Sequence, residues 1–71
     1  MNTLAKKSVG DTYIIKWLLG LPYNVAEYLQ LMDITPGKSI RVIQSCEDYV
    51  IVRSGSHCIA MEAELAAKIR V

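Results

Sequence analysis

Side chains that could bind a transition metal lie in two short stretches of this sequence. Cys46 is followed by Glu47 and Asp48, and His57 is followed by Cys58. Thiolate, imidazole and carboxylate groups are common metal ligands in proteins. Adjacent residues on a strand point to opposite faces, so His57 and Cys58 can share an ion only if a bulge intervenes. Cys46, His57 and Cys58 are therefore candidates for binding Fe(II) or another transition metal, and no cofactor is expected to be required.

The more ordinary interpretation of the same residues is structural. Neither a Cys-x-x-Cys nor a His-x-His pair is present to begin a chelate. If residues 54–56 form a tight hairpin turn, Cys58 lies opposite Ile51 or Arg53 and well away from Cys46. We therefore expect two free, packed thiols and a half-exposed His57 at the hairpin.

Catalysis requires a nucleophile, a base and a pocket, and the residues for it are sparse here. The chain has one His. The carboxylates that lie close to one another in the sequence are Glu47 with Asp48, in a predicted turn, and Glu62 with Glu64, in a charged helical turn. Such positions usually form a solvated surface. The sequence also lacks a glycine-rich phosphate loop, and we predict that the protein is not an enzyme.

Residues suited to binding a protein partner are concentrated in the segment "WLLGLPYN". A strand turns only half of its side chains toward a core, so part of this apolar cluster is expected on the surface, where aromatic residues dominate interface energetics. The alternative is that a short helix folds back and covers it. Exposed cations after a predicted Pro-Gly turn could meet acidic groups of the partner. The predicted partner-binding residues are Trp17, Leu19, Leu21, Tyr23, Lys38 and Arg41.

Composition narrows the classes of function. The 71 residues are 52% hydrophobic, contain no Phe, and carry a formal charge of +1, which does not favour a nucleic-acid-binding surface. The longest apolar runs are far shorter than the roughly 20 residues that span a bilayer. We therefore expect no membrane insertion. A chain of this length has room for one core, so we expect one domain over residues 1–71. The first residues lack the features of a secretory signal, and we expect a cytoplasmic location.

The elements that position these residues are short. Residues 12–19 predict a first strand with Tyr13, Ile15, Trp17 and Leu19 on one face. Residues 21–33 then predict a helix with an apolar face of Val25, Tyr28, Leu29 and Met32, an N-cap at Asn24 and a capping box with Glu27. A flanking hydrophobic staple would join Tyr23 to Tyr28.

The second half of the chain reads as a β-meander. Pro36 and Gly37 suit the central positions of a type II turn. Residues 39–45, 48–54 and 57–61 predict three strands, residues 62–68 a helical turn, and residues 68–71 an edge strand. The expected fold is mainly β, a small, partly open barrel with one short helix between its first two strands, and an open edge would permit self-association.

Several segments in this order are similar to the FeoA family of ferrous iron transport. Leu4 and Gly10 match the family's opening leucine and glycine, "LQLMDITPGKSIRVI" matches its signature of helix end, Pro-Gly turn and strand, and "IAMEAELAAKIRV" resembles its closing segment. The chain departs from the pattern at Asp33, where glycine is usual, near Tyr28, where an arginine is common, and at residues 46–48, where the family's turn is longer.

The resemblance implies an SH3-like barrel that acts as a cytosolic accessory of the membrane Fe(II) transporter. It would dock on a transporter of the FeoB type, which carries a cytosolic GTPase domain, and would regulate or assemble it. Transition metal ion binding is also implied, without a motif that places it. An alternative is a metal-sensing module related to the SH3-like C-terminal domain of iron-dependent repressors of the diphtheria-toxin-repressor type.

Overall fold

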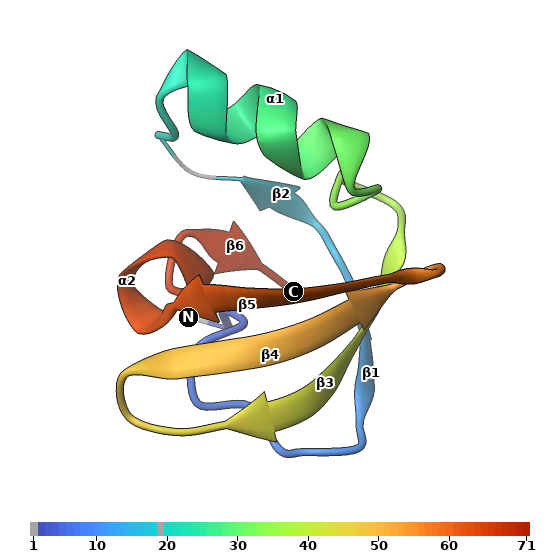
Figure 1. Ribbon diagram of the computed structural model, residues 1–71, viewed down its shortest axis with the longest axis vertical. Coiled ribbons are helices and arrows are strands. Elements are labelled where there is room, and N and C mark those ends of the chain that lie inside the picture. The colour runs from blue at the N-terminus through green and yellow to red at the C-terminus, as the bar shows by residue number, and fades with distance from the viewer. Residues whose placement is uncertain (1, 19) are drawn as a thin grey trace.

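Four antiparallel strands in the order β1-β3-β4-β5 form the larger of two sheets. The structure is a computed structural model that describes residues 2–18 and 20–71. In chain order its elements are β1 (Thr12–Ile14), β2 (Trp17–Leu18), α1 (Tyr23–Leu31), β3 (Ser39–Ser45), β4 (Tyr49–Ser54), β5 (His57–Glu62), α2 (Ala63–Ala66) and β6 (Ile69–Arg70). Figure 1 shows α1 above the smaller β2-β6 sheet, with the four-stranded sheet below.

The strand burial pattern follows from apolar residues at every second position. On β3 and β4, for example, Ile40, Val42, Val50 and Val52 are fully buried, and the residues between them are exposed or half-buried. The three strands predicted for this meander are confirmed to within one residue at each end. The hairpin places Cys58 opposite Arg53, which is one of the two expected registers.

The prediction of one continuous strand over residues 12–19 is wrong, because the segment forms two short strands. Thr12–Ile14 pairs with β3, whereas Trp17–Leu18 pairs with β6. At the break, the Ile15 amide donates to the Lys38 carbonyl at 2.9 Å, and the next amide, of Lys16, donates to the Arg70 carbonyl at 2.7 Å. This change of partner alters the alternation of side chains, so Ile15 is buried but Trp17 is 49% exposed, and Leu18 packs against the core.

The C-terminal strand β6 lies between two segments from the first quarter of the chain. On one side it pairs with β2. On the other side the Leu4 amide donates to the Ile69 carbonyl at 2.9 Å, and the Val71 amide donates to the Asn2 carbonyl at 3.1 Å. Leu4 and Ile69 are both fully buried, so this three-segment arrangement closes the barrel over the core.

The helix begins earlier than the sequence suggested, and the predicted cap and capping box are wrong. Its N-cap is Pro22, whose carbonyl accepts the Ala26 amide at 3.0 Å, so Asn24 lies inside the first turn. Within the described chain, no side chain forms a cap hydrogen bond to this end of α1. The fixed φ of proline already suits entry into a helix, which makes an asparagine cap unnecessary. The Tyr23 hydroxyl donates instead to Glu27 at 3.2 Å, and Tyr23 is 80% exposed, so the predicted staple with Tyr28 is also wrong.

The helix ends in a left-handed residue followed by the predicted turn. Asp33 has φ +62°, the Ile34 amide donates to the Leu29 carbonyl at 2.8 Å, and the Asp33 amide donates to the Gln30 carbonyl at 3.1 Å. These bonds form a Schellman motif. The following Thr35–Lys38 turn is closed by the Lys38 amide and the Thr35 carbonyl at 3.1 Å, with Gly37 at φ +93°, which confirms the expected reversal.

Candidate functional site

The metal-binding candidates lie at two ends of the β3-β4-β5 meander. Cys46 follows β3, and its amide donates to the Tyr49 carbonyl, whereas His57 and Cys58 begin β5 opposite the last residues of β4. Both thiols are free, as expected, but both are exposed, so the prediction that they are packed is wrong. Within residues 2–18 and 20–71, no three His, Cys, Asp or Glu side chains come together as a metal-binding group.

The turn after β3 changes the acidity of Tyr49. The Cys46 side chain accepts a hydrogen bond from the Tyr49 hydroxyl and, when ionised, repels the phenolate, and both effects raise the pKa of Tyr49 above its ordinary value. Partial burial and the charge of Asp48 act in the same direction. Gln44 also donates to the hydroxyl oxygen at 3.1 Å.

The apolar segment predicted to bind a partner is largely on the surface. Tyr23 is 80% exposed, Trp17 is 49% exposed and Leu21 is half-buried against the core, while Leu19 lies outside the described residues. The guanidinium of Arg70, which is opposite Trp17 on β6, lies over the Trp17 ring at 4.9 Å from its centroid in a cation–π contact. The alternative that the helix covers the aromatic residues of this segment is not what the structure shows.

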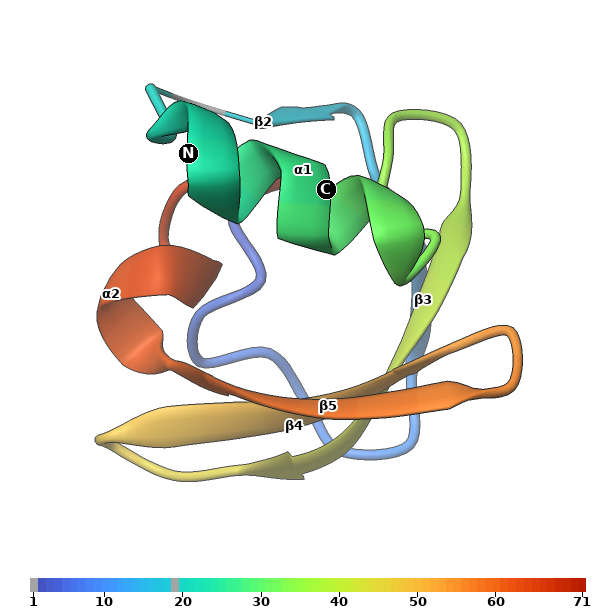
Figure 2. The same ribbon diagram turned by 45° about the horizontal axis from the view of Figure 1, so that its top comes forward.

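A groove of about 280 Å³ continues this surface between the start of α1 and α2. Figure 2 shows the beginning of α1 and α2 on the same side of the molecule. The lining residues are Leu21, Pro22, Val25 and Leu65, which are apolar, and Glu62, Glu64 and Lys68, which are charged. An apolar groove with a few charged groups is the usual form of a binding site. We call Trp17, Tyr23 and the groove-lining residues the docking surface.

The two predicted cations do not join the docking surface as one patch. Lys38 is exposed in the Pro-Gly turn, and Arg41 is exposed on β3, opposite Thr12 and Arg53. Trp17 belongs to the other sheet, opposite Arg70. Arg41 therefore lies on a different sheet from Trp17, and neither cation lines the groove.

Several residues of the docking surface were not predicted. Val25 was assigned to the buried helical face, and Glu62, Glu64, Leu65 and Lys68 to a charged helical turn without a function. The groove forms because α2 folds back beside the residues that precede α1. A contact between segments some 40 positions apart has no local signal in the sequence.

Comparisons with known proteins agree with the geometry. The FeoA domain family matches residues 2–71. A crystal structure of an iron uptake regulatory protein (FeoA) superposes with a TM-score of 0.83 at 29% identity, over 94% of this chain and 89% of that chain. The solution NMR structure of FeoA protein from Chlorobium tepidum has the same TM-score at 19% identity, over 94% of this chain and 65% of that chain. A search of curated proteins finds no match.

These similarities confirm the mainly β, SH3-like fold that the sequence predicted. Neither helix in the described part of the chain has the length and apolar character needed to cross a membrane. Because the FeoA domain match extends over nearly every residue and is supported by the shared barrel, the chain belongs to the FeoA family of small accessory proteins of ferrous iron transport.

Proposed function

We propose that this protein is a non-enzymatic, cytoplasmic accessory that docks on the cytosolic, GTPase-containing part of an FeoB-type ferrous iron transporter. The observation that carries the proposal is the docking surface, in which two exposed aromatic residues and two lining residues of a groove of about 280 Å³, Leu21 and Pro22, lie within one short segment. Family membership supports the Feo system as the place of action. Docking would change the GTPase activity, the gating or the assembly of the transporter.

The chemistry of this surface suits a protein partner. Trp17 and Tyr23 are exposed in the same short segment as the groove-lining residues Leu21 and Pro22, and burying a large apolar side chain contributes about 1.5–3 kcal/mol. Tyr and Trp are also the residues most enriched among those that dominate binding energy. The charged side chains of Glu62, Glu64 and Lys68 around the apolar lining would fix the orientation of the bound segment.

The test is calorimetric titration of the protein with the soluble GTPase-containing portion of the same organism's transporter. We expect Tyr23→Ser and Trp17→Gln each to weaken binding at least tenfold, which corresponds to a loss of about 1.4 kcal/mol or more. Val9 is 59% exposed and lies before β1, outside the docking surface, so Val9→Ser is the matched control and should bind like the wild type.

Each titration is run anaerobically with and without ferrous iron. Binding that does not depend on iron supports a docking accessory, whereas binding only in the presence of iron favours a metal-sensing module. Unchanged affinity in the two aromatic variants, with their folds verified by circular dichroism, would contradict the docking surface.

A further inference from the structure

Two arginines stand side by side on the outer face of the four-stranded sheet. Arg41 on β3 lies directly opposite Arg53 on β4. Thr12 extends the same row on β1, and Cys58 extends it on β5. We call Arg41 and Arg53 the arginine pair.

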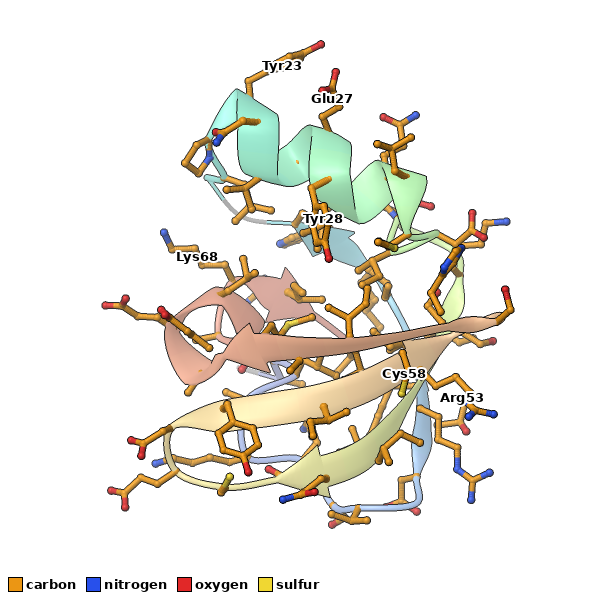
Figure 3. All side chains as sticks on the ribbon, in the orientation of Figure 1. Tyr23, Glu27, Tyr28, Arg53, Cys58 and Lys68 are labelled. Atoms are coloured by element: carbon orange, nitrogen blue, oxygen red, sulfur yellow. The ribbon has the colours of Figure 1, made fainter. Side chains whose placement is uncertain are left out.

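The side chains of the arginine pair point away from the core. Their neighbours along the strands, Ile40, Val42 and Val52, are fully buried, and side chains alternate between faces along a strand. Figure 3 shows Arg53 and Cys58 extending outward from the sheet, away from Tyr23 and Lys68. Directly opposite residues have Cβ atoms about 5 Å apart, and like charges in that position destabilise the sheet.

The positions around the arginine pair on this face do not neutralise it. They are occupied by Thr12, Ile14, Ser39, Ile43, Ile51, Cys58 and Ala60, all within the described chain and none of them acidic. The next carboxylate along the same face of β5 is that of Glu62, four residues beyond Cys58, which is about 13 Å along a strand. Asp33 approaches the hairpin beside Gly55 from the inner side, where its carbonyl accepts the hydroxyl of the buried Ser54.

Aliphatic side chains adjoin the arginines on this face. Ile14 is 53% exposed and Ile43 is 39% exposed. Ile43 owes its position to the irregular register of β3 between Val42 and Gln44, a bulge that leaves it without a cross-strand partner. Arginine is enriched in protein-protein interfaces, and the buried centre of an interface is more apolar than its rim.

We propose that the arginine pair binds an acidic segment of a partner protein, with two carboxylates bridging the two guanidinium groups and aliphatic side chains resting on Ile14 and Ile43. Each guanidinium presents parallel N–H donors that match a carboxylate in a bidentate pair, and an acidic ligand would relieve the repulsion between the arginines. This second surface is separate from the docking surface, so both can be occupied at once and the protein can join two partners or two parts of one partner.

A nucleic acid is the less suitable ligand for this face. Binding along a phosphate backbone requires a series of cations and usually aromatic rings for stacking. On this face the arginine pair is surrounded by isoleucines. The aromatic side chain of Tyr49 lies four residues before Arg53 on β4, opposite Glu62. The overall charge of +1 adds no further attraction.

The test uses a capped synthetic peptide with two adjacent glutamates between isoleucines, together with a matched peptide in which glutamine replaces glutamate. NMR of the full chain should show that the glutamate peptide shifts the side-chain Nε resonances of Arg41 and Arg53 and the amides of Thr12 and Cys58. We expect Arg53→Gln and Arg41→Gln each to weaken binding about fivefold or more at low salt. Lys16→Gln removes the same charge beside the other sheet and should leave the affinity unchanged.

The two exposed thiols supply an internal control, because Cys58 is opposite Arg53 whereas Cys46 precedes Glu47 and Asp48. A bound glutamate peptide should protect Cys58, and not Cys46, from a neutral disulfide reagent. A structural role for the arginines predicts a lower melting temperature in Arg53→Gln, whereas relief of repulsion predicts an equal or higher one, with a smaller response to salt than the wild type shows.

Three results would overturn the proposal. These are equal binding of the glutamine and glutamate peptides, equal loss of affinity in Lys16→Gln and Arg53→Gln, and the absence of any shift at millimolar peptide. Stronger binding of inorganic phosphate or a single-stranded RNA than of the glutamate peptide would reassign the face to phosphate groups. Because the docking surface contains neither arginine, these outcomes are independent of the calorimetric test of the proposed function.

Discussion

At the scale of single residues, the contact between Tyr49 and Cys46 shows how a short turn alters an ionisation. The turn brings the Cys46 sulfur to the Tyr49 hydroxyl, and Asp48 adds a further negative charge. Each of these groups favours the neutral phenol over the phenolate. The raised pKa of Tyr49 therefore reports the geometry of the turn directly.

The first prediction is that Cys46→Ala lowers the pKa of Tyr49 toward its ordinary value of about 10. Asp48→Asn is the matched comparison and should lower it less, since Cys46 is the larger cause. The pKa is measured from the NMR chemical shifts of the Tyr49 ring carbons. A larger decrease in Asp48→Asn than in Cys46→Ala would show that the hydrogen bond is not the main cause.

The same shift predicts the sign of a stability change with pH. Because the pKa of Tyr49 is raised in the folded state, the folded protein holds this proton at a pH where the unfolded chain has lost it. Stability then falls as pH increases from about 10 through the raised pKa. Cys46→Ala should lose less stability over that interval.

The ends of helices and strands were easier to predict from the sequence than the burial of individual side chains. The turn at Pro36 and Gly37 was predicted because proline and glycine restrict or extend the allowed φ in known ways. Asp33 adopts the left-handed conformation, which a short polar side chain tolerates better than most. Cys58 was expected to be packed, but it is exposed opposite Arg53, and because Ile51 and Arg53 lie on the same face of β4, either expected register places it on that outer face.

At the scale of elements, α1 is held to the barrel mainly by one side chain. Leu29 is the fully buried residue of this helix, and Val25 and Met32 pack against the core more partially. Tyr28, which was expected on the apolar face, is 47% exposed. A nine-residue helix is too short to be stable alone, so its position depends on these contacts.

We predict that Leu29→Ala reduces the free energy of unfolding by about 2–5 kcal/mol, because it leaves a cavity under the helix. Leu31 is in the same helix and 73% exposed, so Leu31→Ala should change stability by no more than about 0.5 kcal/mol. Urea unfolding measures both values. Similar losses in the two variants would mean that α1 is not anchored through Leu29.

The break between β1 and β2 marks the limit of pattern-based prediction for elements. The β-branched and aromatic composition of residues 12–19 indicates extended backbone, and that much is confirmed for Thr12–Ile14 and Trp17–Leu18. Composition does not state which neighbour each amide will bond. The Ile15 amide bonds the Lys38 carbonyl and the next amide, of Lys16, bonds the Arg70 carbonyl. This change of partner is determined by how the barrel closes.

At the scale of the whole molecule, residues 69–71 join the beginning of the chain to β2. Ile69 is fully buried, and backbone hydrogen bonds link this segment to Asn2, Leu4 and Lys16. The docking surface also depends on long-range folding, since α2 forms one side of the groove and the start of α1 forms the other. The sequence therefore predicted the exposed aromatic residues of the site but not the groove.

We predict that a chain ending after Lys68 does not fold cooperatively. A protein of this size has a free energy of unfolding of roughly 4–10 kcal/mol, and the truncation removes a buried isoleucine worth about 1.5–3 kcal/mol together with several backbone hydrogen bonds. A chain ending after Arg70 loses half-buried Val71 and should remain folded. Thermal melting followed by circular dichroism compares the two, and a cooperative transition in the shorter chain would contradict the prediction.

The placement of β6 also sets an order of events during synthesis. The ribosome makes β2 more than 50 residues before β6, its partner in the smaller sheet. Until residues 69–71 leave the exit tunnel, the backbone of Trp17 and Leu18 has no strand to pair with, and Leu4 and Ile15 lack part of the core that covers them. Closure of the barrel must therefore follow translation of residues 69–71, and until then part of the core of the nascent chain stays uncovered.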